Sequence, residues 1–158
     1  MTGNYLTLLE ESLKRKLQVM AEVQAYNLRQ QEIFQDEEAQ IEKFDEYVAE
    51  KEVLIEKLNS LDNGFERLYE KVAEELKENR EQYAKQIKAL QKLVTEVTDA
   101  SVAIQAQEAR NKKLIEEFFR KERDGIRMNR KTTRAALDYY KNMSKSAVVM
   151  PQFMDNKQ

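Results

Sequence analysis

The stretch Leu54–Tyr69, which reads LIEKLNSLDNGFERLY, decides how this sequence is expected to fold. It contains Gly64, the only glycine between Gly3 and Gly125. Glycine and proline are the residues that most strongly interrupt helices. On both sides of Gly64 the chain is rich in Leu, Glu, Lys, Gln, Ala and Arg, which favour helix formation. The stretch therefore predicts a chain reversal between two long helices.

The residues beside Gly64 support a tight turn at this point. Asn63 can cap a following helix, and Glu66 stands three residues later, as in a capping box. A connection this short makes the two helices antiparallel neighbours. We therefore expect helices at about 5–61 and about 65–123.

Both predicted helices carry a seam whose positions alternate in steps of three and four, as in a coiled coil. In the first helix the seam comprises Leu6, Leu9, Leu13, Lys16, Met20, Val23, Asn27, Gln30, Phe34, Glu37, Ile41, Phe44, Val48, Lys51, Ile55 and Leu58. In the second it comprises Phe65, Tyr69, Val72, Leu76, Asn79, Tyr83, Ile87, Leu90, Val94, Val97, Ser101, Ile104, Glu108, Asn111, Ile115 and Phe118. The pattern predicts an all-α fold, an elongated antiparallel hairpin or bundle of long, coiled-coil-like helices.

Two stretches are candidate break points in these helices. Near Asp36, the stretch Gln35–Glu38 is polar, although the seam continues in register across it. Near Asp99, the stretch Val97–Ser101 combines β-branched and polar residues, which weaken a helix. Two successive steps of four meet at Tyr83, which predicts a local unwinding of the supercoil. The register favours continuous helices, with breaks near 36 and 99 as the alternative.

The predicted hairpin matches apolar seam residues with apolar ones and polar residues with polar ones. It pairs Leu9 with Phe118, and it brings Lys16 near Glu108. Two helices bury such a seam only partly, so a third helix or a second chain should cover the rest.

The chain after Gly125 supplies a candidate for that cover. A shorter helix is predicted at about 126–142, where it would fold onto the open end of the hairpin. Residues 1–142 would then form a single helical-bundle domain, and 143–158 a flexible tail.

The composition argues against catalysis. The 158-residue chain has neither histidine nor cysteine, which excludes nucleophile–base pairs built on them and thiolate metal sites. Its three isolated glycines form no phosphate-binding loop. Its paired carboxylates fit a solvated acidic face better than a metal site, because a ferritin-like site also needs histidine. We therefore expect no enzyme activity, no cofactor and no bound metal.

The hydropathy pattern predicts a cytoplasmic protein. No apolar run approaches the ~18 residues of a membrane span, and Glu10 and Glu11 interrupt the region where a signal peptide would lie. A basic cluster at Arg120–Arg134 is interrupted by Glu122 and Asp124 and lacks aromatic residues for base stacking. We therefore expect no membrane span and no nucleic-acid partner.

The C-terminal region is the predicted partner-binding surface. It combines methionine and aromatic residues, which suit adaptable binding of helices. For three of these residues, Met128, Leu137 and Tyr140, packing in the bundle core is an equally strong alternative. The candidate residues are Ile126, Met128, Leu137, Tyr140, Met143, Val148, Val149, Met150, Phe153 and Met154.

Two segments of the chain resemble the flagellar export chaperones of the FlgN family. Residues 50–61, EKEVLIEKLNSL, are similar to the family's EK..LI..L..L segment. Residues 108–115, EARNKKLI, are similar to its N..LL segment, with Ile115 in the last position. With length and helix layout, the resemblance covers about residues 5–142.

This resemblance implies a cytosolic, non-catalytic chaperone. Such a protein would bind hook–filament junction proteins before their secretion and help deliver them to the export gate. Its C-terminal part would supply much of the binding surface. The alternative is a structural coiled-coil protein whose apolar seam serves homodimerisation.

Overall fold

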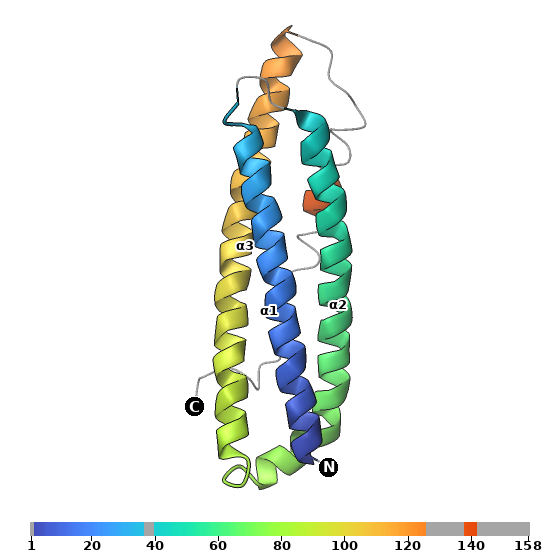
Figure 1. The fold of residues 1–158 in the computed structure, drawn as a ribbon, viewed down its shortest axis with the longest axis vertical. Helices are drawn as coiled ribbons and strands as arrows, with labels where there is room; N and C mark the ends of the chain where they lie inside the picture. The colour runs from blue at the N-terminus through green and yellow to red at the C-terminus, as the bar shows by residue number, and fades with distance from the viewer. Residues whose placement is uncertain (1, 37–39, 126–137, 142–158) are drawn as a thin grey trace.

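A computed structural model describes residues 2–36, 40–125 and 138–141, and its described residues form three long helices and one short helical segment (Figure 1). The long helices are α1 (Thr2–Ile33), α2 (Ile41–Glu78) and α3 (Ala84–Gly125). Each helix runs antiparallel to the one before it, so that α1 and α3 are parallel. The predicted all-α, elongated antiparallel bundle is confirmed.

The predicted continuous helix over 5–61 is wrong, because the chain reverses between α1 and α2. Phe34 N–H donates to the Gln31 carbonyl at 3.2 Å, a bond that tightens the last turn of α1. Gln35 and Asp36, which follow α1, are exposed. The reversal brings the ring of Phe34 to 5.6 Å from that of Phe44, edge to face. The alternative break near Asp36 is thus confirmed, as a full reversal.

The predicted turn at Gly64 is also wrong, because Gly64 lies in the interior of α2. No described glycine has a positive φ. Leu58, Phe65 and Val72 follow one another at seven-residue steps and are 5%, 4% and 1% exposed. Burying each such side chain contributes about 1.5–3 kcal/mol, whereas a glycine costs a helix only about 1 kcal/mol. The burial of these apolar side chains therefore stabilises a helix that continues through Gly64.

The second reversal occurs after Glu78, so the predicted helix over 65–123 is split. Asn79 ends α2, and its N–H donates to the Glu75 carbonyl at 3.0 Å. The turn runs to Tyr83, the seam position where the two steps of four meet. That irregularity marked a chain reversal rather than a local unwinding.

The alternative break near Asp99 is wrong, since α3 continues through it. The hydroxyls of Thr95 and Thr98 donate to the carbonyls of Gln91 and Val94, at 3.1 and 2.9 Å. Their polar groups are therefore satisfied within the helix. Val97 is fully buried and holds this stretch against the core.

The pairing that followed from a turn at Gly64 is replaced by another. Lys16 pairs with Asp62 of α2 and not with Glu108. Leu9 and Phe118 lie in different apolar clusters. Both errors follow from the position of the turn, since moving it changes every cross-helix partner.

The core consists of two apolar clusters. The long cluster is built from α1, α2 and α3 and contains Leu6, Leu9, Leu13, Val19, Met20, Val23, Leu54, Leu58, Phe65, Val72, Leu76, Leu90, Val94, Val97 and Ile104. The short cluster lies beyond it, towards the end where α1 meets α2, and contains Phe44, Val48, Ile115, Phe119, Tyr139 and Tyr140. The residues between the two clusters are polar and are described below.

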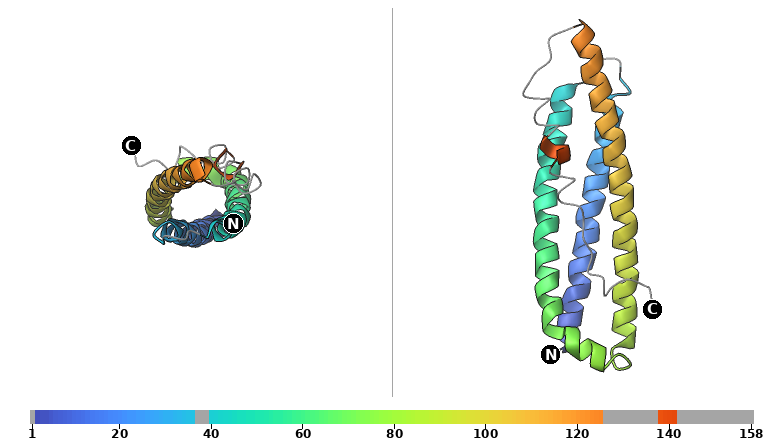
Figure 2. Two further views of the ribbon diagram at one scale, coloured as in Figure 1. Left: turned by 90° about the horizontal axis from the view of Figure 1, so that it is seen from above. Right: turned by 180° about the vertical axis from the view of Figure 1, so that it is seen from behind.

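The three helices are not packed symmetrically. α1 contacts both α2 and α3, whereas no Cα atom of α2 lies within 8 Å of a Cα atom of α3. The short helical segment 138–141 lies against α2 on the side away from α1, as the view from behind shows (Figure 2). Of the predicted helix over 126–142, only this segment lies in the described part of the chain, and the predicted tail over 143–158 lies outside it. Among the described helices, none is long and apolar enough to cross a membrane.

Replacing Gly64 with alanine tests its place in α2. A Cβ atom at this position meets nothing within 4 Å. We expect Gly64→Ala to raise the free energy of unfolding by about 0.5–1 kcal/mol, because alanine favours the helix and restricts the unfolded chain. Urea denaturation measures the change. A loss of stability would contradict a helical Gly64, since a glycine turn with positive φ does not accept alanine.

Candidate functional site

A fully buried lysine lies between the two apolar clusters. Lys51 of α2 is 0% exposed, and its Nζ donates to three oxygens. These are Asn27 Oδ1 of α1 at 2.8 Å, Glu108 Oε1 of α3 at 2.9 Å and Glu108 Oε2 at 3.1 Å. The long side chains of Lys51 and Glu108 thus bridge α2 and α3, whose backbones do not approach each other. A buried charge of this kind requires its partner, because an uncompensated one costs several kcal/mol.

Amide side chains fix this ion pair to α1. Asn27 Nδ2 donates to Gln107 Oε1 at 3.2 Å, and Asn111 Nδ2 donates to the Asn27 carbonyl at 3.0 Å. One turn further along α1, Gln30 Nε2 donates to the Phe44 carbonyl at 3.2 Å. We call Asn27, Gln30, Lys51, Glu108 and Asn111 the polar layer; all five are at most 5% exposed. Such a network fixes the register of the three helices, as buried polar residues do in coiled coils.

Tyr139 of the short helical segment closes the polar layer. Its side chain is 1% exposed, and its hydroxyl donates to Glu108 Oε1 at 2.6 Å. The Lys51 Nζ lies 4.0 Å from the centre of the Tyr139 ring, within the range of a cation–π interaction. One tyrosine therefore contacts both members of the ion pair, with its hydroxyl on the anion and its ring on the cation.

Burial shifts the titration of the groups in and around the polar layer. It lowers the pKa of Lys51 from 10.5 to about 8, although the charge and the hydrogen bond of Glu108 oppose the change. It also raises the pKa of Tyr139, and the nearby charge of Glu108 raises it further. At neutral pH Lys51 is therefore charged, and Tyr139 is a neutral donor. The arrangement suits recognition of an aromatic hydroxyl.

The lowered pKa of Lys51 predicts a pH dependence of stability. Between pH 8 and 10 the folded chain has released a proton that the unfolded chain still holds, so the free energy of unfolding rises with pH. We expect wild type to gain about 2–3 kcal/mol over this window relative to Lys51→Met/Glu108→Gln. Above pH 10 the raised pKa of Tyr139 acts in the opposite direction, since its ionisation is then favoured in the unfolded chain. Denaturant titrations of both chains measure the difference, and parallel profiles would contradict it.

One of the predicted partner-binding residues lies in the described part of the chain. Tyr140 is 9% exposed and packs in the short apolar cluster. The alternative of core packing therefore holds for Tyr140, and its side chain is not an exposed docking residue. The other candidates lie outside the described residues: Ile126, Met128, Leu137, Met143, Val148, Val149, Met150, Phe153 and Met154.

The polar layer was not predicted as a site, although the seam contained its signal. Asn27, Lys51, Glu108 and Asn111 all occupy seam positions, where a polar residue is buried and needs a partner. Their partners depend on how the helices align, and Tyr139 comes from another segment. Sequence periodicity alone does not provide either fact.

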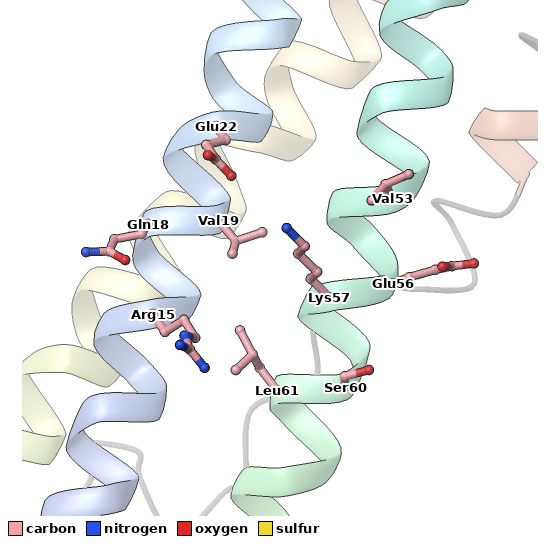
Figure 3. A pocket seen from close by; sticks show the side chains of 9 residues that line it. All are labelled: Arg15, Gln18, Val19, Glu22, Val53, Glu56, Lys57, Ser60 and Leu61. Carbon is pink, nitrogen blue, oxygen red and sulfur yellow. The ribbon is translucent and has the colours of Figure 1, made fainter.

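Apart from the polar layer, an open groove lies between α1 and α2 (Figure 3). It encloses about 670 Å³ and is lined by Arg15, Gln18, Val19, Glu22, Val53, Glu56, Lys57, Ser60 and Leu61. Val53 is 53% exposed, and charges of both signs stand around the groove. It is an amphipathic surface groove without a buried polar group.

The described residues offer no metal site, since no group of three or more carboxylates there is arranged to hold an ion. Within the described part of the chain, the polar layer with Tyr139 joins buried polar groups from α1, α2, α3 and segment 138–141. Comparisons with protein-family models, with curated proteins and with solved structures found no match for this chain.

Proposed function

We propose that this chain is a non-catalytic, cytoplasmic export chaperone that binds helical segments of flagellar hook–filament junction proteins before their secretion. The observation that carries the proposal is the separation of α2 from α3. Both helices pack on α1, yet no pair of their Cα atoms comes within 8 Å. Of the described residues, only the short segment 138–141 occupies the space between α2 and α3, so a further helix can pack there as in a four-helix bundle.

The segments that resemble FlgN chaperones support this proposal. Lys51 belongs to the first resembling segment, and Glu108 and Asn111 belong to the second. In the folded chain these residues join in one polar layer, through the 2.9 Å ion pair and the contacts with Asn27. The resemblance therefore includes buried residues that set the register of the bundle.

A client helix would bind by helix-in-groove packing. An amphipathic helix lays its apolar face against the flanks of α2 and α3, and so completes a four-helix arrangement. Each large apolar side chain that becomes fully buried contributes about 1.5–3 kcal/mol, so a few such residues suffice for micromolar affinity. Covering an aggregation-prone client helix in this way needs no catalytic group. Delivery to the export gate would follow from the same complex.

The alternative, a coiled coil that dimerises through its apolar seam, is less well supported. Leu9, Met20 and Val23 are seam residues of α1, and each is 0% exposed within a single chain. A seam that is buried inside one chain leaves no need for a second copy to cover it.

A pull-down with the C-terminal segments of hook–filament junction proteins tests the proposal. We expect the full-length chain to retain them at micromolar concentration, and light scattering to show a monomer without client. The deletion of residues 143–158 should leave the helix content unchanged and weaken binding. Absence of binding by the full-length chain, or a tight dimer that excludes the client, would contradict the chaperone function.

A further inference from the structure

Two adjacent tyrosines of the short helical segment occupy different environments. The hydroxyl of Tyr139 donates to Glu108 Oε1 at 2.6 Å, inside the polar layer. The hydroxyl of Tyr140 is buried and has no hydrogen-bond partner among the described residues. Both side chains are at most 9% exposed, so burial does not distinguish them. Only Tyr139 has its hydroxyl matched to a charged acceptor.

The ion pair of Lys51 and Glu108 resembles a binding site, and Tyr139 of the same chain occupies it. The ion pair of Lys51 and Glu108 is held by Asn27 and needs no tyrosine for charge balance. Its free side faces the gap between α2 and α3, where Tyr139 places its ring 4.0 Å from Lys51 Nζ. A hydrogen bond to a charged group is stronger than one between neutral groups. The carboxylate of Glu108 therefore favours a ligand that donates a hydroxyl.

We propose that the ion pair of Lys51 and Glu108 is a recognition site for an aromatic hydroxyl, which Tyr139 fills in the free chain and a tyrosine of a partner helix fills in the complex. This inference rests on the proposed function in one respect, namely that the partner helix enters between α2 and α3. Residues 138–141 then act as a built-in competitor.

The chemistry of the internal occupant defines the partner. A helix that enters the gap displaces Tyr139 from Glu108 and must replace its hydrogen bond, because a buried acceptor left unpaired is costly. A tyrosine on the apolar face of the helix meets this requirement, since it offers a ring to Lys51 and a hydroxyl to Glu108. A helix that carries phenylalanine at this position would bind more weakly, because it leaves Glu108 without a hydrogen-bond donor. Sites built around a hydrogen bond discriminate well against analogues that lack it.

The competition also sets the strength of binding. A competitor within the same chain is present at a high effective concentration. Any partner is therefore bound more weakly than the empty site would bind it. Removing the side chain of Tyr139 should strengthen binding in trans.

A peptide that copies the internal occupant tests the site directly. The probe is a fluorescein-labelled peptide of residues 130–146, RKTTRAALDYYKNMSKS, titrated into full-length chain and followed by fluorescence anisotropy. Three versions are compared: the parent, Tyr139→Phe and Tyr140→Phe. We expect the full-length Tyr139→Ala variant to bind the parent peptide at least about tenfold more tightly than wild type does.

The two substituted peptides form a matched pair, since each loses one hydroxyl from the same peptide. We expect Tyr139→Phe in the peptide to weaken binding about tenfold or more, and Tyr140→Phe to leave it unchanged. Equal affinities of the parent and the Tyr139→Phe peptide would overturn the proposal. So would the absence of peptide binding to a folded Tyr139→Ala chain. If that chain does not melt cooperatively, the Tyr139→Phe full-length chain takes its place, because it keeps the ring and loses only the hydroxyl.

Two further measurements separate the alternatives. Sedimentation of the wild-type chain should show a monomer; a dimer that exchanges segment 138–141 between copies would overturn the assignment to a partner helix. Junction-protein segments are titrated in parallel. If these segments fail to bind while the peptides behave as expected, the proposed chaperone function is wrong and the proposed hydroxyl site is supported. If the segments bind but the peptides do not behave as expected, the hydroxyl site is wrong and the chaperone function is supported.

Discussion

Replacing Lys51 with methionine is expected to lower the free energy of unfolding by about 3–5 kcal/mol at neutral pH. Methionine fills nearly the same volume but leaves the carboxylate of Glu108 without its cation. Glu108 is only 5% exposed, so water cannot replace the lost charge. Thermal and urea denaturation, followed by circular dichroism, measure the effect.

A second substitution shows where this loss comes from. Adding Glu108→Gln to Lys51→Met removes the stranded charge and keeps an oxygen for the hydroxyl of Tyr139. We expect the double variant to recover most of the stability, because a buried ion pair adds little net stability beyond neutral side chains of similar shape. The matched control is Lys57→Met, an exposed lysine six residues further along α2, with an effect within about 0.5 kcal/mol. Equal losses at Lys51 and Lys57, or no recovery in the double variant, would contradict this account.

Replacing Phe44 with alanine is expected to cost about 3–5 kcal/mol as well, through a different mechanism. Phe44 is 0% exposed and packs against Phe34, with ring centres 5.6 Å apart. It belongs to the short apolar cluster with Tyr139 and Tyr140, so its removal leaves a cavity beside them. The same denaturation experiments measure the loss of stability.

Binding of the 130–146 peptide gives this variant a second observable effect. Phe44 packs in the same cluster as Tyr139 and Tyr140, so its loss weakens the contacts of the internal segment and of the added peptide alike. The full-length Phe44→Ala chain should therefore bind the peptide no more tightly than wild type does, in contrast to Tyr139→Ala. The control is Val53→Ala, also in α2 but 53% exposed, for which we expect a stability change within about 0.5 kcal/mol. A small effect of Phe44→Ala on stability would mean that the short apolar cluster does not hold this end of the bundle.

The sequence by itself determined that the chain is helical and, for α1, which residues face the core. The seam of α1 was read correctly, including its polar members. Lys16, Asn27 and Gln30 occupy seam positions and are each at most 2% exposed. This succeeds because helical periodicity is a local property, and a seam position is buried whichever helix covers it.

Only the tertiary structure decided where the chain reverses and which residues meet. Gly64 looked like a turn, yet α2 continues through it, since the burial of Leu58 and Phe65 outweighs the cost of one glycine. The reversals fall instead in polar stretches, near Asp36 and at Asn79–Tyr83. The meeting of Lys51 with Glu108 and Tyr139 depends on the alignment of segments far apart in the chain. Partner choice across helices is a property of the whole packing, which a periodic pattern satisfies equally well in several registers.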